Sequence, residues 1–233
     1  MTTSVGATRT PPMGDSELLA RVTNWVKTHQ KATTWIVSIV AIAAALLTWT
    51  QISNRRSEKI ASAELTPARL AFEARNFQLA SSELSRLVEN YSGTNAANEA
   101  ELILGQVRLA QGQSEAAIEQ LRKFAPGANR LYRAQAFGLL AAAYENVGHA
   151  REAAEAYQRA ADGAELPFLR AQFLSDVGRS WVEARDTAKA IAAYQEIVSK
   201  LDSTGSAVEA RVRLGELTRG AVTRMTLQPP TSK

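Results

Sequence analysis

The hydrophobic positions along the chain follow two different patterns. Residues 32–54 run for 23 positions without a charged side chain, and as a helix they would span about 34 Å, slightly more than the hydrocarbon core of a bilayer. After residue 60, apolar residues recur at helical spacing with polar residues between them, which is typical of amphipathic helices packed on one face. The pattern predicts an all-α chain with one uncharged segment followed by a helical domain.

Residues 32–54 are expected to form a single N-terminal transmembrane helix. A cleaved signal peptide would have a shorter apolar core with a small-residue cleavage site directly after it, whereas about 31 residues precede this segment. A buried core helix would rarely stay uncharged for so long. Aromatic and basic residues stand where membrane interfaces favour them. The expected membrane-interface residues are Trp25, Lys31, Trp35, Trp49, Arg55 and Arg56.

The segments around the anchor are polar. Residues 1–14 are expected to be a disordered arm. Residues 15–31 carry apolar residues at helical spacing, which is typical either of an amphipathic juxtamembrane helix or of an early start of the transmembrane helix. Residues 55–66 are expected to be a helical connector. Three Lys or Arg residues flank each end of the anchor, so the positive-inside rule gives a tie; the short arm favours a cytoplasmic N-terminus.

The rest of the chain repeats with a period of 36 or 37 residues, in units that start near 61, 98, 134 and 171. The eighth position of each unit is small, the twentieth is alanine, and a large apolar residue stands four further on. A small residue on the first helix of a hairpin is expected to face the alanine on the second. The small residues are Ala68, Gly105, Ala141 and Gly178. The alanines at the twentieth position are Ala80, Ala117, Ala153 and Ala190, and the large apolar residues are Leu84, Leu121, Tyr157 and Tyr194.

The units resemble the tetratricopeptide repeat. The resemblance is carried by Leu104-Gly105, Gly112, Ala117 and Leu121, and again by Leu140-Ala141, Gly148, Ala153 and Tyr157. It implies an α-solenoid of about four helical hairpins over residues 67–224, because one hairpin cannot bury its apolar face alone. In the first unit Pro67 is expected to begin the first helix, since proline is tolerated in a first turn.

The last helix, from about residue 206, is expected to cap the solenoid as a half-repeat. The alternative is a basic docking face for anionic lipid or an acidic partner. Its arginines are Arg211, Arg213, Arg219 and Arg224. Residues 225–233 are expected to be a flexible tail after Gln228-Pro229-Pro230.

Composition and charge exclude several function classes. The chain has no cysteine, which excludes disulfides, thiol nucleophiles and cysteine-ligated zinc. The formal net charge of +4 leaves the repeats nearly neutral, and no nucleic-acid partner is expected. His29 and His149 lack spaced partners for a metal or a general base. No catalytic residue, cofactor or metal is expected, and we interpret the protein as a non-enzyme.

A partner is expected on the inner face of the stack, formed by the first helix of each repeat. This candidate groove is apolar at one end and polar at the other, which suits an amphipathic helix or an apolar extended segment. The alternative is that Leu102, Ile103 and Leu109 are buried inside the domain. The candidate groove residues are Leu102, Ile103, Gln106, Leu109, Gln135, Leu139, Asn146, Gln172, Asp176 and Arg179.

The layout predicts a membrane-anchored scaffold for protein–protein interaction. A basic arm, one anchor with tryptophan at its ends and a compact repeat array are similar to the ancillary subunit of the bacterial Sec translocon. That resemblance implies a single-pass protein of the bacterial inner membrane, with the repeats in the periplasm and envelope folding factors as partners. The alternative is a structural accessory subunit, stably bound to a large respiratory, photosynthetic or envelope-assembly complex.

Overall fold

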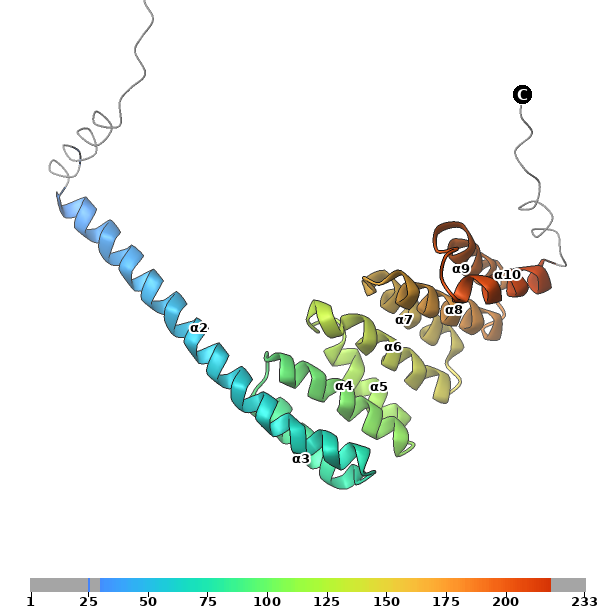
Figure 1. The fold of residues 1–233 in the computed structure, drawn as a ribbon, viewed down its shortest axis with the longest axis horizontal. Helices are drawn as coiled ribbons and strands as arrows, with labels where there is room; N and C mark the ends of the chain where they lie inside the picture. The colour runs from blue at the N-terminus through green and yellow to red at the C-terminus, as the bar shows by residue number, and fades with distance from the viewer. Residues whose placement is uncertain (1–24, 26–29, 219–233) are drawn as a thin grey trace, which may run out of the picture. The chain divides into compact units, whose positions relative to one another are not determined.

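The computed structural model describes residue 25 and residues 30–218, which are helical or lie in short turns (Figure 1). Within this part of the chain there is no strand, and the all-α expectation is confirmed. The helices are α2 (Gln30–Glu73), α3 (Phe77–Asn90), α4 (Asn95–Ala110), α5 (Ser114–Phe124), α6 (Arg130–Asn146), α7 (Ala150–Gly163), α8 (Pro167–Glu183), α9 (Thr187–Lys200) and α10 (Ser206–Leu217). The expected arm 1–14, the tail 225–233 and most of the segment 15–31 lie outside the described residues.

The chain divides into two compact units, Met1–Arg55 and Arg56–Lys233. In the first unit, α2 exposes large apolar side chains, including Trp35 at 72% and Trp49 at 75%. Trp25 and Arg55 are also exposed, while the side chain of Lys31 lies outside the described residues. Across residue 25 and residues 30–218, no helix has both the length and the apolar character needed to cross a membrane.

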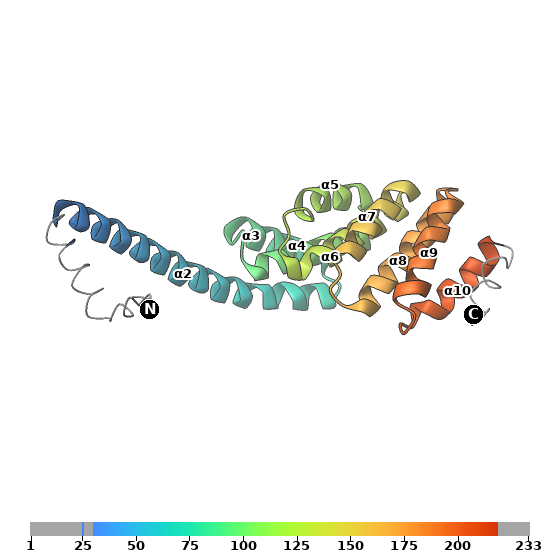
Figure 2. The ribbon, with the colours of Figure 1, turned by 90° about the horizontal axis from the view of Figure 1, so that it is seen from above.

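In the second unit, successive helices form the expected hairpins. The last part of α2 pairs with α3, α4 with α5, α6 with α7, and α8 with α9, while α10 packs on α8 and α9. Figure 2 shows α5 and α7 on one side of the repeats and α4 and α6 on the other. We call the side formed by α4, α6, α8 and α10 the first-helix face. This arrangement confirms a helical solenoid.

The four hairpin turns share one backbone conformation. The second residue after the first helix has positive φ in every repeat, 57° at Arg75, 73° at Gly112 and Gly148, and 60° at Arg185. The next backbone N–H then donates back to the first helix, as from Gln113 N to Arg108 O at 2.8 Å. Glycine adopts this left-handed conformation without steric cost, and the two arginines adopt it at some cost.

Pro67 does not begin a helix, so that expectation is wrong. α2 passes through Pro67 to Glu73, because the face of α2 that carries Leu65 and Ala68 is buried against α3 and α4. A proline inside a helix removes one hydrogen bond, and this packing offsets the loss.

Glu58 on the preceding turns of α2 caps the start of α4. It accepts hydrogen bonds from Asn95 N at 2.7 Å and from Ala96 N at 3.1 Å, and these two backbone donors have no partner within α4.

The small residues of the repeats face larger partners than expected. A Cβ on Gly178 would lie 2.4 Å from Tyr194 Cζ, and one on Gly105 would meet Leu139 and Leu121. The expectation that each faces the alanine of the second helix is therefore wrong for these two glycines. The small residue instead makes room for the large apolar residue four positions after that alanine.

The apolar interior consists of two clusters that meet along α4. The N-terminal cluster joins α2, α3 and one side of α4, including Leu84 and Ile103. The C-terminal cluster runs from Leu102 through Leu121 and Trp181 to Leu214 on α10. Since Leu214 is buried there, α10 covers the end of the C-terminal cluster, in line with the expected capping role.

Candidate functional site

The apolar end of the expected groove is closed by the protein's own core. Leu102 and Ile103 are only 9% and 8% exposed, and they pack into the C-terminal and N-terminal clusters respectively. Leu109 and Leu139 are half-buried against the same core. Leu102 and Ile103 are therefore core residues and not part of an accessible groove, because α4 lies between two clusters and buries both of its flanks.

The polar part of the expected groove is accessible. Gln106, Gln135, Asn146, Gln172 and Arg179 are exposed on α4, α6 and α8, while Asp176 is half-buried. Of these, Gln172, Asp176 and Arg179 line one cavity of about 310 Å³ between α8 and α10. We call it the α8–α10 pocket.

Sequence reasoning missed the other wall of the α8–α10 pocket. α10 contributes Glu209, Arg213, Glu216 and Leu217, and Tyr194 of α9 also lines the pocket. A signal was available, because Glu209, Arg213 and Glu216 follow Gln172, Asp176 and Arg179 by one repeat of 37 residues. Treating α10 as a full first helix would have placed these residues on the same face.

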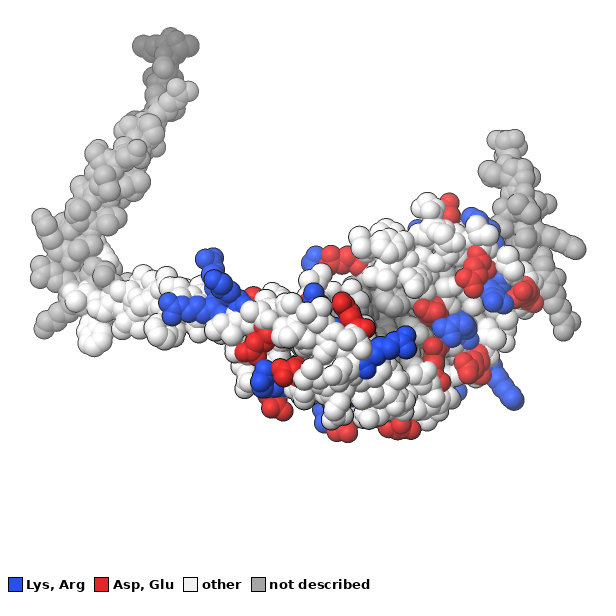
Figure 3. All heavy atoms as spheres, turned by 60° about the horizontal axis from the view of Figure 1, so that its bottom comes forward, with Lys and Arg blue, Asp and Glu red and all other residues white. Residues whose placement is uncertain are grey.

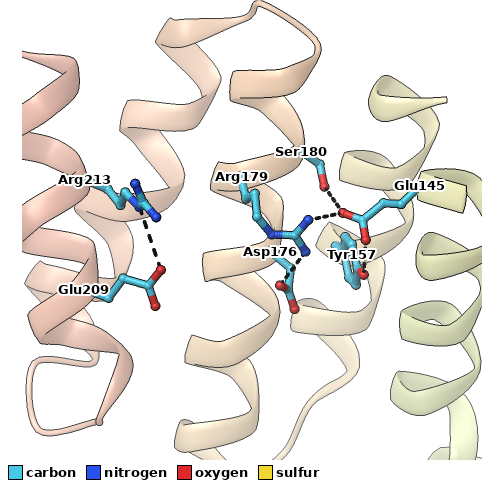
Figure 4. A network of polar contacts seen from close by, with 7 residues as sticks. All are labelled: Glu145, Tyr157, Asp176, Arg179, Ser180, Glu209 and Arg213. Atoms are coloured by element: carbon cyan, nitrogen blue, oxygen red, sulfur yellow. Dashed lines mark hydrogen bonds and ion pairs between the residues drawn. The ribbon is translucent and has the colours of Figure 1, made fainter. Parts of the chain in front are cut away.

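A polar network fixes the α8 wall of the pocket (Figure 4). Arg179 donates from Nη1 to Glu145 Oε1 at 2.6 Å and from Nη2 to Asp176 Oδ1 at 2.9 Å. Glu145 also accepts from Ser180 Oγ and from the Tyr157 hydroxyl, each at 3.0 Å. These bonds hold the Arg179 guanidinium in place, because both of its terminal nitrogens have carboxylate partners.

Burial perturbs the titration of this network. Burial raises the pKa of Asp176 above its ordinary value, and the contacts with Arg179 oppose this effect. Burial and the nearby Glu145 also raise the pKa of the Tyr157 hydroxyl. Tyr157 therefore stays protonated and serves as a hydrogen-bond donor to Glu145.

The α10 wall carries its own charged set. Arg213 lies 3.1 Å from Glu216 and 3.8 Å from Glu209, measured from guanidinium nitrogen to carboxylate oxygen. This pairing weighs against the alternative of a basic docking face on α10, since Arg213 already has carboxylate neighbours. Arg211 is exposed, and Arg219 and Arg224 lie outside the described residues. Figure 3 shows acidic and basic side chains mixed on the visible face, without a continuous basic stripe.

The second-helix side has three further grooves, between α3 and α5, α5 and α7, and α7 and α9. In the last of these, Lys189 Nζ lies 3.9 Å from the centre of the Trp181 ring. In the first, Arg108 and Glu101 share Gln120 through hydrogen bonds. Among the described residues, no group of three or more His, Asp or Glu is placed to hold a metal ion.

Comparisons with known proteins support the repeat assignment. Residues 60–167 match a family described as a tetratricopeptide repeat-like domain. No curated protein matches the chain significantly. The fold is similar to nearly identical TPR-like repeats of a candidate kinesin light chain from Podosopora anserina (TM-score 0.54, 18% identity, 73% of this chain and 90% of that chain). It is also similar to MamA (TM-score 0.54, 21% identity, 71% of this chain and 85% of that chain). At these identities the structures show the fold alone.

Proposed function

We propose that this protein is a non-enzymatic, membrane-anchored scaffold that holds a segment of a partner protein on its first-helix face. The observation that carries this proposal is the α8–α10 pocket, an open cavity of about 310 Å³ on a stack of TPR-like hairpins. Such repeats generally serve protein binding, and stacked repeats present extended binding surfaces. The exposed amides of Gln106, Gln135 and Gln172 along the same face offer hydrogen bonds to a bound backbone.

The anchor in this proposal is residues 32–54 within α2. This stretch exposes large apolar side chains such as Ile39, Ile42 and Leu46, and water solvates such a surface poorly. The hydroxyls of Thr48 and Thr50 are satisfied inside the helix, because Thr48 donates to Ala44 O and Thr50 donates to Leu47 O, both at 2.9 Å. Internal satisfaction of polar groups is what a bilayer requires. In this proposal the anchor crosses a bacterial inner membrane, with the N-terminus in the cytoplasm and the repeats on the periplasmic side.

Within this proposal, the favoured role is an ancillary translocon subunit that recruits envelope folding factors. The support is the layout of basic arm, anchor with tryptophan at its ends, and adjoining repeats. Only residues 55–60 separate the anchor from Ala61, the first residue of α2 in the N-terminal cluster. Partners are therefore themselves at the membrane or close to it.

A structural accessory subunit is the second candidate, and one surface feature favours it. Leu131 at the start of α6 and Leu166 and Phe168 near the start of α8 are all exposed large apolar residues. An ion pair between Arg130 and Glu165 joins these two stretches of chain. Apolar groups gathered at one edge are typical of a fixed interface with another subunit.

The test is purification from native membranes in a mild detergent through a tag after Lys233, followed by mass spectrometry and native-gel sizing. Translocon subunits with soluble folding factors at variable occupancy support the first role. One large complex at fixed stoichiometry supports the second instead. Alkaline carbonate extraction of the same membranes tests the anchor, and release of the chain into the supernatant would contradict it.

Paired variants test the binding face. Gln135→Arg combined with Gln172→Arg places bulk and charge on the first-helix face, whereas Gln78→Arg combined with Gln195→Arg makes the same chemical change at exposed positions of α3 and α9. The first pair is expected to lose the co-purifying partners and the second to keep them. Equal retention by both pairs would exclude the first-helix face as the binding site.

A further inference from the structure

The charges of the α8–α10 pocket do not balance. Its lining carries three carboxylates, from Asp176, Glu209 and Glu216, against the two guanidinium groups of Arg179 and Arg213. A fourth carboxylate, that of Glu145, accepts a hydrogen bond from Arg179 but is not part of the pocket lining. The pocket therefore has an excess of negative charge although it contains two arginines.

Both arginines of the pocket already have carboxylate partners. Arg179 donates to Glu145 and Asp176, and Arg213 contacts Glu209 and Glu216. Among the described residues, Asp176 Oδ2, Glu209 Oε2 and Glu216 Oε1 accept no hydrogen bond. An incoming group thus meets carboxylate oxygens with open lone pairs beside arginines whose charge carboxylates already balance.

The walls around these acceptors are partly apolar. Val182 on α8 is 44% exposed, and Leu217 on α10 is half-buried at the cavity edge. Tyr194 of α9 adds an aromatic side chain to the lining. Long basic side chains suit such a site, because their methylene stems pack on apolar surface while the charged end reaches polar groups.

We propose that the α8–α10 pocket receives a lysine or arginine side chain of the partner segment, with an adjacent apolar residue of that segment resting on Val182 and Leu217. This inference rests on the proposed function, in which the first-helix face holds a protein segment. The cation would contact the open oxygens of Asp176, Glu209 and Glu216, and its stem would lie along the apolar wall. The partner is thereby a basic and apolar peptide segment.

A cation fits this pocket better than an anion or a neutral group. An acidic side chain would face three carboxylates, and like charges at close range are repulsive. A neutral side chain would leave the excess negative charge of the pocket uncompensated and would partly desolvate the carboxylates at a cost in free energy.

The test measures binding of three fluorescein-labelled peptides to the full chain in a neutral maltoside detergent by fluorescence anisotropy. The peptides have equal length and alternate leucine with arginine, glutamine or glutamate. The pocket variant is Glu209→Gln with Glu216→Gln. The matched control is Glu119→Gln with Glu155→Gln, which removes the same two charges from exposed positions of α5 and α7. Circular dichroism establishes that each variant is folded, and Glu209→Gln alone provides a milder change.

The Leu–Arg peptide is expected to bind about tenfold more tightly than the Leu–Gln peptide, the order expected for a few partly desolvated charge contacts. The pocket variant should remove most of this preference and Glu209→Gln alone about half, while the control variant keeps it. Equal loss in the control, or equal binding of the Leu–Arg and Leu–Gln peptides, would overturn the proposal.

A second comparison separates this inference from the proposed function. If the three peptides bind alike but all are lost in Gln135→Arg with Gln172→Arg, the first-helix face binds proteins without selecting a cation, and only the inference fails. If the variant Gln135→Arg with Gln172→Arg still binds the peptides and still co-purifies with the native partners, the proposed binding face fails as well.

Discussion

Replacing Gly178 with alanine tests how tightly the last complete repeat is packed. A Cβ at this position would lie 2.4 Å from Tyr194 Cζ and 2.7 Å from both Cε atoms, where ordinary contacts exceed about 3.4 Å. The ring is rigid and only 2% exposed. It must therefore shift by about 1 Å inside a close-packed core.

Two opposing effects set the magnitude of the Gly178→Ala change. Alanine is favoured over glycine inside a helix by about 1 kcal/mol. Overpacking of a well-packed core costs about 1–3 kcal/mol, and a rigid buried ring places this site in the upper part of that range. The net expectation is a loss of about 1–2 kcal/mol in the free energy of unfolding.

A double-mutant cycle isolates the contact. Tyr194→Leu introduces leucine, the residue at the equivalent position of the second repeat, Leu121. In that repeat the atoms nearest Gly105 are the ends of flexible leucine side chains. In the Tyr194→Leu background, Gly178→Ala should cost at least about 1 kcal/mol less than in the wild type. Gly105→Ala is the matched control and should be nearly neutral, since those leucine ends can move.

The assay is urea unfolding of the full chain in detergent, followed by far-UV circular dichroism at fixed protein concentration. Stabilisation by Gly178→Ala of about 1 kcal/mol, as for an exposed helical glycine, would refute the packing argument. Additivity of the two substitutions would refute it too, because the predicted cost comes entirely from the ring of Tyr194.

Three further changes are expected to alter stability in the same urea assay. Glu58→Ala removes the acceptor of Asn95 N and Ala96 N and should cost about 1–2 kcal/mol, as loss of a helix cap does. Glu58→Gln keeps one acceptor oxygen and should cost less, and equal costs of the two variants would contradict a hydrogen-bonded cap. Leu121→Ala removes a fully buried side chain and should cost about 2–5 kcal/mol, and a smaller loss would mean that the cluster collapses around the cavity. Burial raises the pKa of Glu101, with the hydrogen bond from Gln120 opposing; the folded state therefore binds the proton more tightly than the unfolded state, and the ionised group costs stability above the folded pKa. Glu101→Gln should stabilise the domain near neutral pH and lose this advantage as the pH falls through the raised folded pKa of Glu101, until none remains below about 4.3, the unfolded pKa. A pH-independent effect would contradict the argument.

The sequence predicted the hairpins well because their signals are local. The turn after each first helix needs one left-handed residue, and glycine at 112 and 148 marks it directly. The buried alanines at the twentieth position also recur in every unit, each fully buried. Such features depend on contacts within one hairpin, so each unit repeats them.

The errors came from contacts between units. Pro67 was judged by its missing N–H alone, whereas the face of α2 that packs on α3 and α4 carries the helix past it. For Leu102 and Ile103 the sequence left two interpretations open, an accessible groove or the domain interior. The interior is confirmed, because each residue belongs to a core cluster. A one-dimensional period does not say which neighbour covers a side chain, and this choice decides burial.

The first-helix face shows how one repeated framework can differ locally in chemistry. Three positions recur at a spacing of 37 residues in successive first helices and change toward the C-terminal end. They read Gln135, Leu139 and Ala142 on α6, then Gln172, Asp176 and Arg179 on α8, then Glu209, Arg213 and Glu216 on α10. Of these three sets, only the last two are charged, and both line the α8–α10 pocket. Because close packing restricts the residue type only at buried positions, the exposed members of these sets, such as Gln135, Arg179 and Glu216, are free to differ. The selectivity that we propose for the scaffold would therefore lie where its repeats are least alike.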